Sequence, residues 1–173
     1  MLTGSLDGSI RLWNPRTGAC EKAMQSGPGG HFHDAGVICL DMMSDSSSVI
    51  SGGEDGSVFL SNFTTGKPLG ELRGGHEEGD AVEVAGFCPH LPIAATGDVQ
   101  GNLCLWDLNA MQLRSTCKHP QGKAVVRMRW HPTAMSVVTA CVGACQGFLC
   151  VRGGGKRVGA LRRRVSVKSR FIQ

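Results

Sequence analysis

Three similar stretches decide the fold: LTGSLDGSIRLWNPRTG at residues 2–18, ISGGEDGSVFLSNFTTG at 50–66 and AATGDVQGNLCLWDLNA at 94–110. They align on Gly8, Gly56 and Gly101, which are spaced 48 and 45 residues apart. In each stretch a short apolar run meets a turn and then returns as an alternating apolar and polar run. This is the pattern of a β-hairpin, and its recurrence at a fixed period predicts an array of similar units.

Further strands are predicted on both sides of these hairpins. Apolar runs at 37–40 and 82–87 precede two of the hairpins and end in turn-forming sequence, whereas 68–72 and 113–117 follow the hairpins. Each period therefore predicts a four-stranded antiparallel meander. The fold class that follows is all-β.

One position of the repeat holds Trp13-Asn14, Ser61-Asn62 and Trp106-Asp107, and Gly30-His31 and Gly75-His76 precede two of these pairs by about 30 residues. In these features the chain resembles the WD-repeat family, whose unit is one blade of a β-propeller. Within it, residues 82–132 are similar to the late blades of the angio-associated migratory cell protein family. That family includes a fungal assembly chaperone for a large-subunit ribosomal protein.

The period predicts an incomplete propeller with about two complete blades, near 31–72 and 76–117, and two partial ones. Residues 1–141 are the expected WD-repeat region, and the period is lost at about Val142. Residues 142–173 are expected to be a disordered basic Gly/Arg-rich tail. We expect an open set of blades to be a truncated product or one with a reading frame shifted after Cys141; an open half propeller that pairs with a partner is the alternative.

Charge separates the same two regions. The chain has 18 Lys and Arg against 14 Asp and Glu, a net charge of +4. Residues 151–173 hold eight basic and no acidic residues, so residues 1–150 sum to 10 − 14 = −4. Ser166, after three arginines, is a candidate phosphosite, and the tail leaves open a nucleic-acid-binding function or a nuclear import signal. We consider direct nucleic-acid binding the weaker alternative, because the tail lacks interleaved aromatic residues.

The resemblance implies that most recurring polar residues form a buried hydrogen-bond network that ties each blade together. These framework residues are Asp7, Trp13, His31, Ser51, Asp55, His76, Thr96, Trp106 and Asp107. Two networks are expected to be incomplete, because Ser61 stands where tryptophan is expected and Gln100 replaces a turn aspartate. The sequence supplies no partnered nucleophile, phosphate loop or zinc-ligand spacing, so we predict no enzyme, cofactor, metal or small-molecule substrate.

A protein-interaction scaffold is the function that remains. The loop that enters the second full blade carries Glu77, Glu78 and Asp80, and Glu83 follows on the next strand. Concentrated acidic residues suit a basic partner. With the resemblance, this predicts a chaperone for a basic ribosomal protein in large-subunit assembly; a signalling or cell-migration adaptor is the alternative. The sequence shows no secretion signal or membrane span, so we expect a cytoplasmic protein with access to the nucleus.

Overall fold

The computed structural model describes residues 1–24, 32–43, 45, 47–119 and 122–142, and the backbone of 148–150 and 160–161. These residues form β-strands and turns, and the described part of the chain contains no helix. The all-β prediction is confirmed. Within the same residues there is accordingly no helix with the length and apolarity that a membrane crossing needs.

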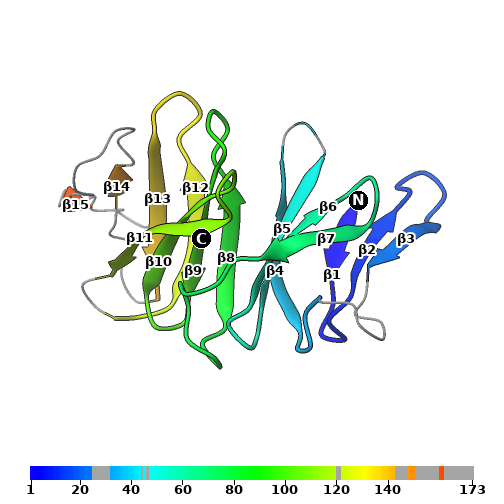
Figure 1. Cartoon of the computed structure of the whole chain (residues 1–173), viewed down its shortest axis with the longest axis horizontal. Coiled ribbons are helices and arrows are strands. Elements are labelled where there is room, and N and C mark those ends of the chain that lie inside the picture. The colour runs from blue at the N-terminus through cyan, green and yellow to red at the C-terminus, as the bar shows by residue number, and fades with distance from the viewer. Residues whose placement is uncertain are drawn as a thin grey trace, which may run out of the picture.

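Four antiparallel sheets follow one another across the molecule (Figure 1). The first sheet contains β1 (Leu2–Gly4), β2 (Ile10–Trp13) and β3 (Cys20–Met24). The second contains β4 (Val37–Met42), β5 (Ser48–Gly53), β6 (Val58–Asn62) and β7 (Lys67–Glu71). The third contains β8 (Val82–Phe87), β9 (Ile93–Asp98), β10 (Asn102–Asp107) and β11 (Gln112–Lys118). The fourth contains β12 (Val125–Trp130), β13 (Ser136–Cys141), β14 (Phe148–Cys150) and β15 (Ala160–Leu161). Every sheet pairs strands in chain order, as the repeat predicts.

The repeated glycine closes each predicted hairpin and also touches the next unit. Gly8, Gly56 and Gly101 have φ values of +75°, +87° and +83°, a backbone conformation that glycine adopts without steric cost. A Cβ atom on Gly56 would lie 2.3 Å from the carbonyl oxygen of Glu77, in the loop that enters β8. A Cβ atom on Gly8 or Gly101 would lie 2.6 Å from the carbonyl oxygen of His33 or 2.7 Å from that of Lys123, respectively. The glycine therefore serves both the turn and the contact between sheets.

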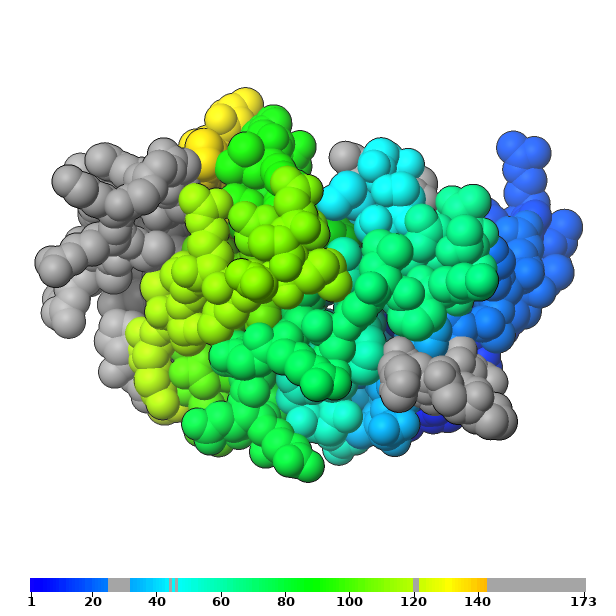
Figure 2. All heavy atoms as spheres, in the orientation of Figure 1, coloured from blue at the N-terminus to red at the C-terminus, as the bar shows by residue number. Residues whose placement is uncertain are grey.

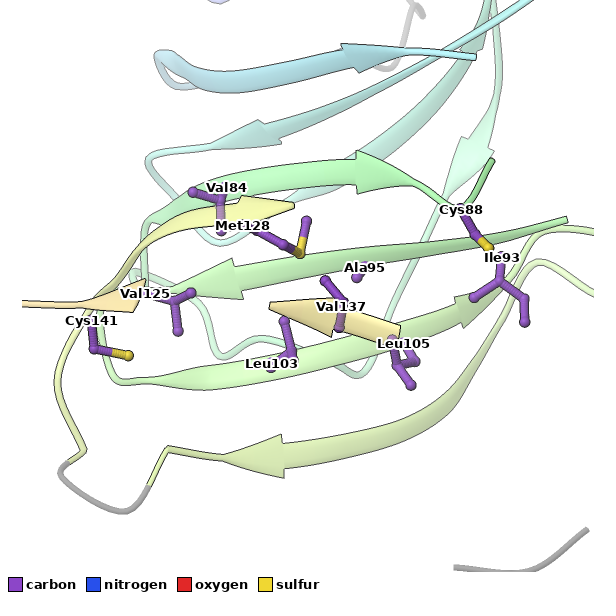
Figure 3. Packing of buried hydrophobic residues seen from close by; sticks show 10 residues of the cluster. All are labelled: Val84, Cys88, Ile93, Ala95, Leu103, Leu105, Val125, Met128, Val137 and Cys141. Carbon is purple, nitrogen blue, oxygen red and sulfur yellow. The ribbon is translucent and has the colours of Figure 1, made fainter. Parts of the chain in front are cut away.

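Apolar side chains fill the spaces between neighbouring sheets. Ile10, Met24, Phe32 and Val37 form the cluster between the first and second sheets. The cluster between the second and third sheets contains Ile50, Val58, Leu60, Leu72, Val82, Phe87, Ala94, Cys104 and Trp106. Figure 3 shows the cluster between the third and fourth sheets, made of Val84, Cys88, Ile93, Ala95, Leu103, Leu105, Val125, Met128, Val137 and Cys141. Since each full burial of such a side chain contributes about 1.5–3 kcal/mol, packing between sheets is a main source of stability.

Side chains of the neighbouring sheets cover polar groups on β8, an edge strand of the third sheet. The Oδ2 atom of Asp41 on β4 accepts a hydrogen bond of 2.8 Å from the backbone N–H of Phe87. From the other side, the indole N–H of Trp130 on β12 donates to the carbonyl oxygen of Gly86 at 3.1 Å. Backbone groups on the edge of a strand invite pairing with other strands unless they are covered. These contacts satisfy two such groups and tie three sheets together.

Two short strands lie within the segment predicted to be a disordered tail. The backbone of β14 pairs with β13 in the register Val137↔Leu149, and β15 pairs with β14 in turn. The expectation of an irregular tail therefore does not hold for these five residues. The remaining residues from 143 onward, including Ser166, lie outside the described part of the chain, and the prediction for them stays a prediction.

Candidate interaction surface and the networks that support it

A buried hydrogen-bond network connects strands β9 and β10 of the third sheet. The hydroxyl oxygen of Thr96 lies 2.7 Å from Nε2 of His76 and 2.7 Å from the indole nitrogen of Trp106. On its other side, Nδ1 of His76 lies 2.7 Å from Oδ2 of Asp98. We assign the Nδ1 proton to this contact with the carboxylate, and Nε2 then accepts a hydrogen bond from the hydroxyl of Thr96. The structure thus brings together His76, Thr96 and Trp106, as the family pattern implies.

Asp98 corrects the prediction that this network lacks its acidic member. Alignment of the repeats placed Gln100 at the position of the turn aspartate, but Asp98 supplies the carboxylate from the end of β9. Asp98 is fully buried. Burial opposes its ionisation, but hydrogen bonds from His76 and Asn102 outweigh this effect and lower the pKa of Asp98 below its usual value.

The second sheet contains a similar buried hydrogen-bond network, but a different histidine from the predicted one lies at its centre. His31 was predicted to pair with Ser51, but His31 lies outside the described residues, and His33 makes the contact. Nε2 of His33 lies 2.8 Å from the hydroxyl of Ser51, and Nδ1 lies 2.7 Å from the hydroxyl of Ser57. Ser57 in turn donates to Oδ1 of Asp55 at 2.6 Å. The turn aspartate therefore reaches the histidine through a serine.

Gly53 explains why the two sheets differ. It lies three residues before the turn glycine, as Asp98 does in the third sheet. A Cβ atom on Gly53 would lie 2.4 Å from Oδ1 of Asp55 and 2.6 Å from Nδ1 of His33. A side chain at this position would therefore displace the Asp55–Ser57 pair. The acidic member of the network therefore comes from the turn in the second sheet, as Asp55, and from the end of β9 in the third sheet, as Asp98.

The second sheet has serine at the position of Trp106, but it has a large aromatic residue, Phe32, immediately before its histidine. A Cβ atom on Gly75 would lie 2.5 Å from the ring of Trp106, so Trp106 requires glycine before His76. In the second sheet Phe32 precedes His33, and it is buried in the corresponding cluster between sheets. A large side chain thus stands before the histidine where the third sheet has glycine, and Ser61 has a buried hydroxyl with no hydrogen-bond partner among the described residues.

The remaining framework residues hold turns and strand pairs. The indole N–H of Trp13 donates to the hydroxyl of Thr3 at 2.8 Å within the first sheet. Hydrogen bonds from the side chain and backbone of Ser9 lower the pKa of Asp7 to about 2. Asp107 accepts hydrogen bonds from the backbone N–H groups of Asn109 and Ala110 in the turn before β11. Each contact fixes local backbone geometry.

The predicted acidic loop lies at the end of the molecule where the hairpin turns are found, at the lower edge of the view in Figure 2. Glu77 and Glu78 are exposed, and Asp80 is half-buried and accepts a hydrogen bond from the side chain of Gln100 at 3.1 Å. The backbone N–H of Gly79 donates to the carbonyl oxygen of Asp55 at 2.8 Å. The loop is therefore anchored at its backbone, while two carboxylates face solvent.

Glu83 lies on β8, after the loop, as predicted. It is half-buried and sits in β8 where the pairing with β9 is irregular. Burial raises the pKa of the nearby Cys39 thiol to about 12, and the charge of Glu83 contributes to the increase. Sequence reasoning missed Asp34 and Glu54, which are exposed in the corresponding loop and turn of the second sheet. The shared position of loops and turns in the repeat is the signal that could have found them.

The described residues contain no group of three or more His, Cys, Asp or Glu side chains arranged to hold a metal ion. Both ring nitrogens of His33 are occupied by serine hydroxyls, and the six cysteines in this part of the chain are free thiols.

Known proteins show the same repeat. The family model for the WD domain, G-beta repeat, matches residues 1–14 and 26–60. Human angio-associated migratory cell protein is 30% identical over 152 residues, which cover 81% of this chain and 34% of that protein. An uncharacterized WD repeat-containing protein of Schizosaccharomyces pombe is also 30% identical over 152 residues, covering 85% of this chain and 37% of the relative. The chain thus spans about a third of the length of these relatives.

A solved structure, that of U3-55K, matches the fold with a TM-score of 0.74 and 18% sequence identity, covering 86% of this chain and 43% of that one. At this identity the likeness concerns the fold alone. It agrees with the four-stranded sheets, the repeated hairpins and the packing between sheets described above. The chain is therefore a WD-repeat protein whose sheets are blades of a partial β-propeller.

Proposed function

We propose that this chain is a non-enzymatic scaffold that binds a basic segment of a partner protein, and that the partner is a ribosomal protein of the large subunit. WD-repeat proteins are generally protein-interaction scaffolds. The observation that carries the finer proposal is the anchored loop with Glu77 and Glu78 exposed beside Asp80. We expect the complex to form in the cytoplasm, with access to the nucleus.

The anchoring of the loop favours recognition. Gly79 is bonded to the second sheet and Asp80 to Glu77 through the backbone, so the loop pays little conformational entropy on binding. The exposed carboxylates of Asp34 and Glu54 lie in the corresponding loop and turn of the neighbouring blade. A surface with one sign of charge accelerates encounter with an oppositely charged partner and selects against acidic ones.

The test is the affinity of the full chain for a basic segment of a large-subunit ribosomal protein, measured at two salt concentrations. The variant Glu77→Ser/Glu78→Ser/Asp80→Ser should weaken binding about tenfold and reduce the salt dependence, because charge steering is screened by salt. The control Glu21→Ser/Asp45→Ser removes exposed carboxylates from β3 and from the turn after β4. Undiminished binding by the loop variant would contradict the proposal. Association with signalling proteins that is insensitive to salt would favour the adaptor function.

A further inference from the structure

The second blade contains a cavity that borders the His33 network, and Asp55 and Ser57 of that network form part of its lining. We propose that this cavity binds an arginine side chain of a partner protein. This proposal rests on one part of the proposed function, namely that the chain binds a basic protein. It names a different site from the acidic loop: the cavity lies between the residues before β4, the 55–57 turn, β6 and β7.

The cavity has the size and lining for a long side chain with a charged end. Its volume is about 420 Å³. Phe32 and Phe59 form apolar walls, with ring centroids 6.5 Å apart, and both are buried. Leu69 of β7 completes the apolar lining and is 53% exposed. Such a surface can pack against the three methylene groups of arginine.

Three carboxylates lie around the cavity: Asp34, Asp55 and Glu71. The charge of each of them favours the protonated form of His33. Burial nevertheless lowers the pKa of His33 below its usual value, so the histidine stays neutral at neutral pH and does not offset them. With Arg73, the titratable side chains that line the cavity carry −3 + 1 = −2. A cationic ligand matches this charge.

The chain's own Arg73 pairs with one of these carboxylates at the edge of the cavity. Its Nη2 atom lies 2.6 Å from Oε2 of Glu71, and Nε donates to the same oxygen at 2.7 Å. The Arg73 side chain is 81% exposed, so little packing holds it in place. An exposed ion pair of this kind contributes less than about 1 kcal/mol. An incoming arginine can therefore displace Arg73 from Glu71.

Arginine fits this cavity better than lysine does. A guanidinium is planar, hydrogen-bonds carboxylates through two donors at once and stacks on aromatic rings, whereas the ammonium of lysine is a compact, strongly hydrated charge. The carboxylates offer the paired hydrogen bonds that a guanidinium can form, and the apolar lining packs against the methylene groups of the same side chain. The acidic loop, by contrast, attracts any positive charge.

The experiment compares two fluorescent Gly/Ser peptides, one with two arginines and one with two lysines, by anisotropy with the full chain. We expect the arginine peptide to bind about fivefold more tightly, because its guanidinium can form paired charge-assisted hydrogen bonds. Asp34→Asn/Glu71→Gln should abolish this preference, and Leu69→Ser should reduce it. Arg73→Ala should tighten binding of the arginine peptide, since it removes the competing guanidinium. Equal affinity for the two peptides, or an unchanged preference in the double variant, would overturn the proposal.

Two controls separate this inference from the proposed function. Glu54→Gln removes a carboxylate next to Asp55 that does not line the cavity, and it should leave the preference for arginine unchanged. The loop variant Glu77→Ser/Glu78→Ser/Asp80→Ser should weaken both peptides equally. Loss of the arginine preference alone would leave the ribosomal proposal standing. A preserved preference with no binding of the ribosomal segment would overturn that proposal and leave the arginine site.

Discussion

At the scale of single residues, one hydroxyl oxygen in the third sheet provides the hydrogen-bond partner for two buried side chains. Thr96 is fully buried, and its hydroxyl is shared between His76 and Trp106. In the second sheet Ser51 contacts the histidine, but serine replaces the tryptophan, and the Ser61 hydroxyl has no partner in the described part of the chain. The third sheet therefore depends more on its central hydroxyl than the second does.

Thr96→Val tests this difference, because valine keeps the shape of threonine and removes only the hydroxyl. It leaves a ring nitrogen of His76 and the indole N–H of Trp106 buried without a partner. Since each such group costs about 1–3 kcal/mol, we expect the free energy of unfolding to fall by about 2–4 kcal/mol. Urea unfolding measures it, with the exposed Thr64→Val as the control. A loss no larger than that of the control would show that the hydroxyl is dispensable.

At the scale of elements, the hairpin is the part of the repeat that sequence predicts best. Alternating apolar residues and the turn glycine fixed the strands β5, β6, β9 and β10, because backbone sterics leave few alternatives. The histidine was harder to place, since His33 lies four residues before β4 whereas His76 lies six before β8. Asp98 was missed because a carboxylate can reach the histidine from two backbone positions. The cavity beside Phe32 was not predictable, because its lining comes from four separate segments.

Gly56→Ala separates the two tasks of the turn glycine. Gly56 combines a φ of +87° with a Cβ position 2.3 Å from the carbonyl oxygen of Glu77. Gly18 is the matched control, because its φ is +71° and no other described residue comes within 4 Å of its Cβ position. We expect Gly18→Ala to cost about 1 kcal/mol through the backbone alone. Gly56→Ala should cost about 2 kcal/mol more in urea unfolding, because the 77–81 loop must move. Equal costs would mean that the contact between sheets is not tight.

At the scale of the whole molecule, the sheets form a row in which each one packs on its neighbours through a separate cluster. Stability in such an array is approximately the sum of terms for each unit and for each interface. The hydrogen bonds that β8 donates to Asp41 and accepts from Trp130 add a polar link between three sheets. The order of the sheets therefore predicts which sheets a packing defect at one interface will destabilise.

Met128→Ala tests whether stability is local. Met128 is buried between the third and fourth sheets (Figure 3), whereas Met42 at the end of β4 is 40% exposed and serves as the control. Truncating a buried methionine costs about 2–5 kcal/mol. Because β12 and β13 pack on one described neighbour, we expect their amides to exchange with solvent faster in Met128→Ala, while β5 and β6 keep wild-type protection in hydrogen-exchange measurements. Equal acceleration of exchange in β5, β6, β12 and β13 would show that the sheets unfold as one unit. A packing defect at one interface would then also destabilise the acidic loop.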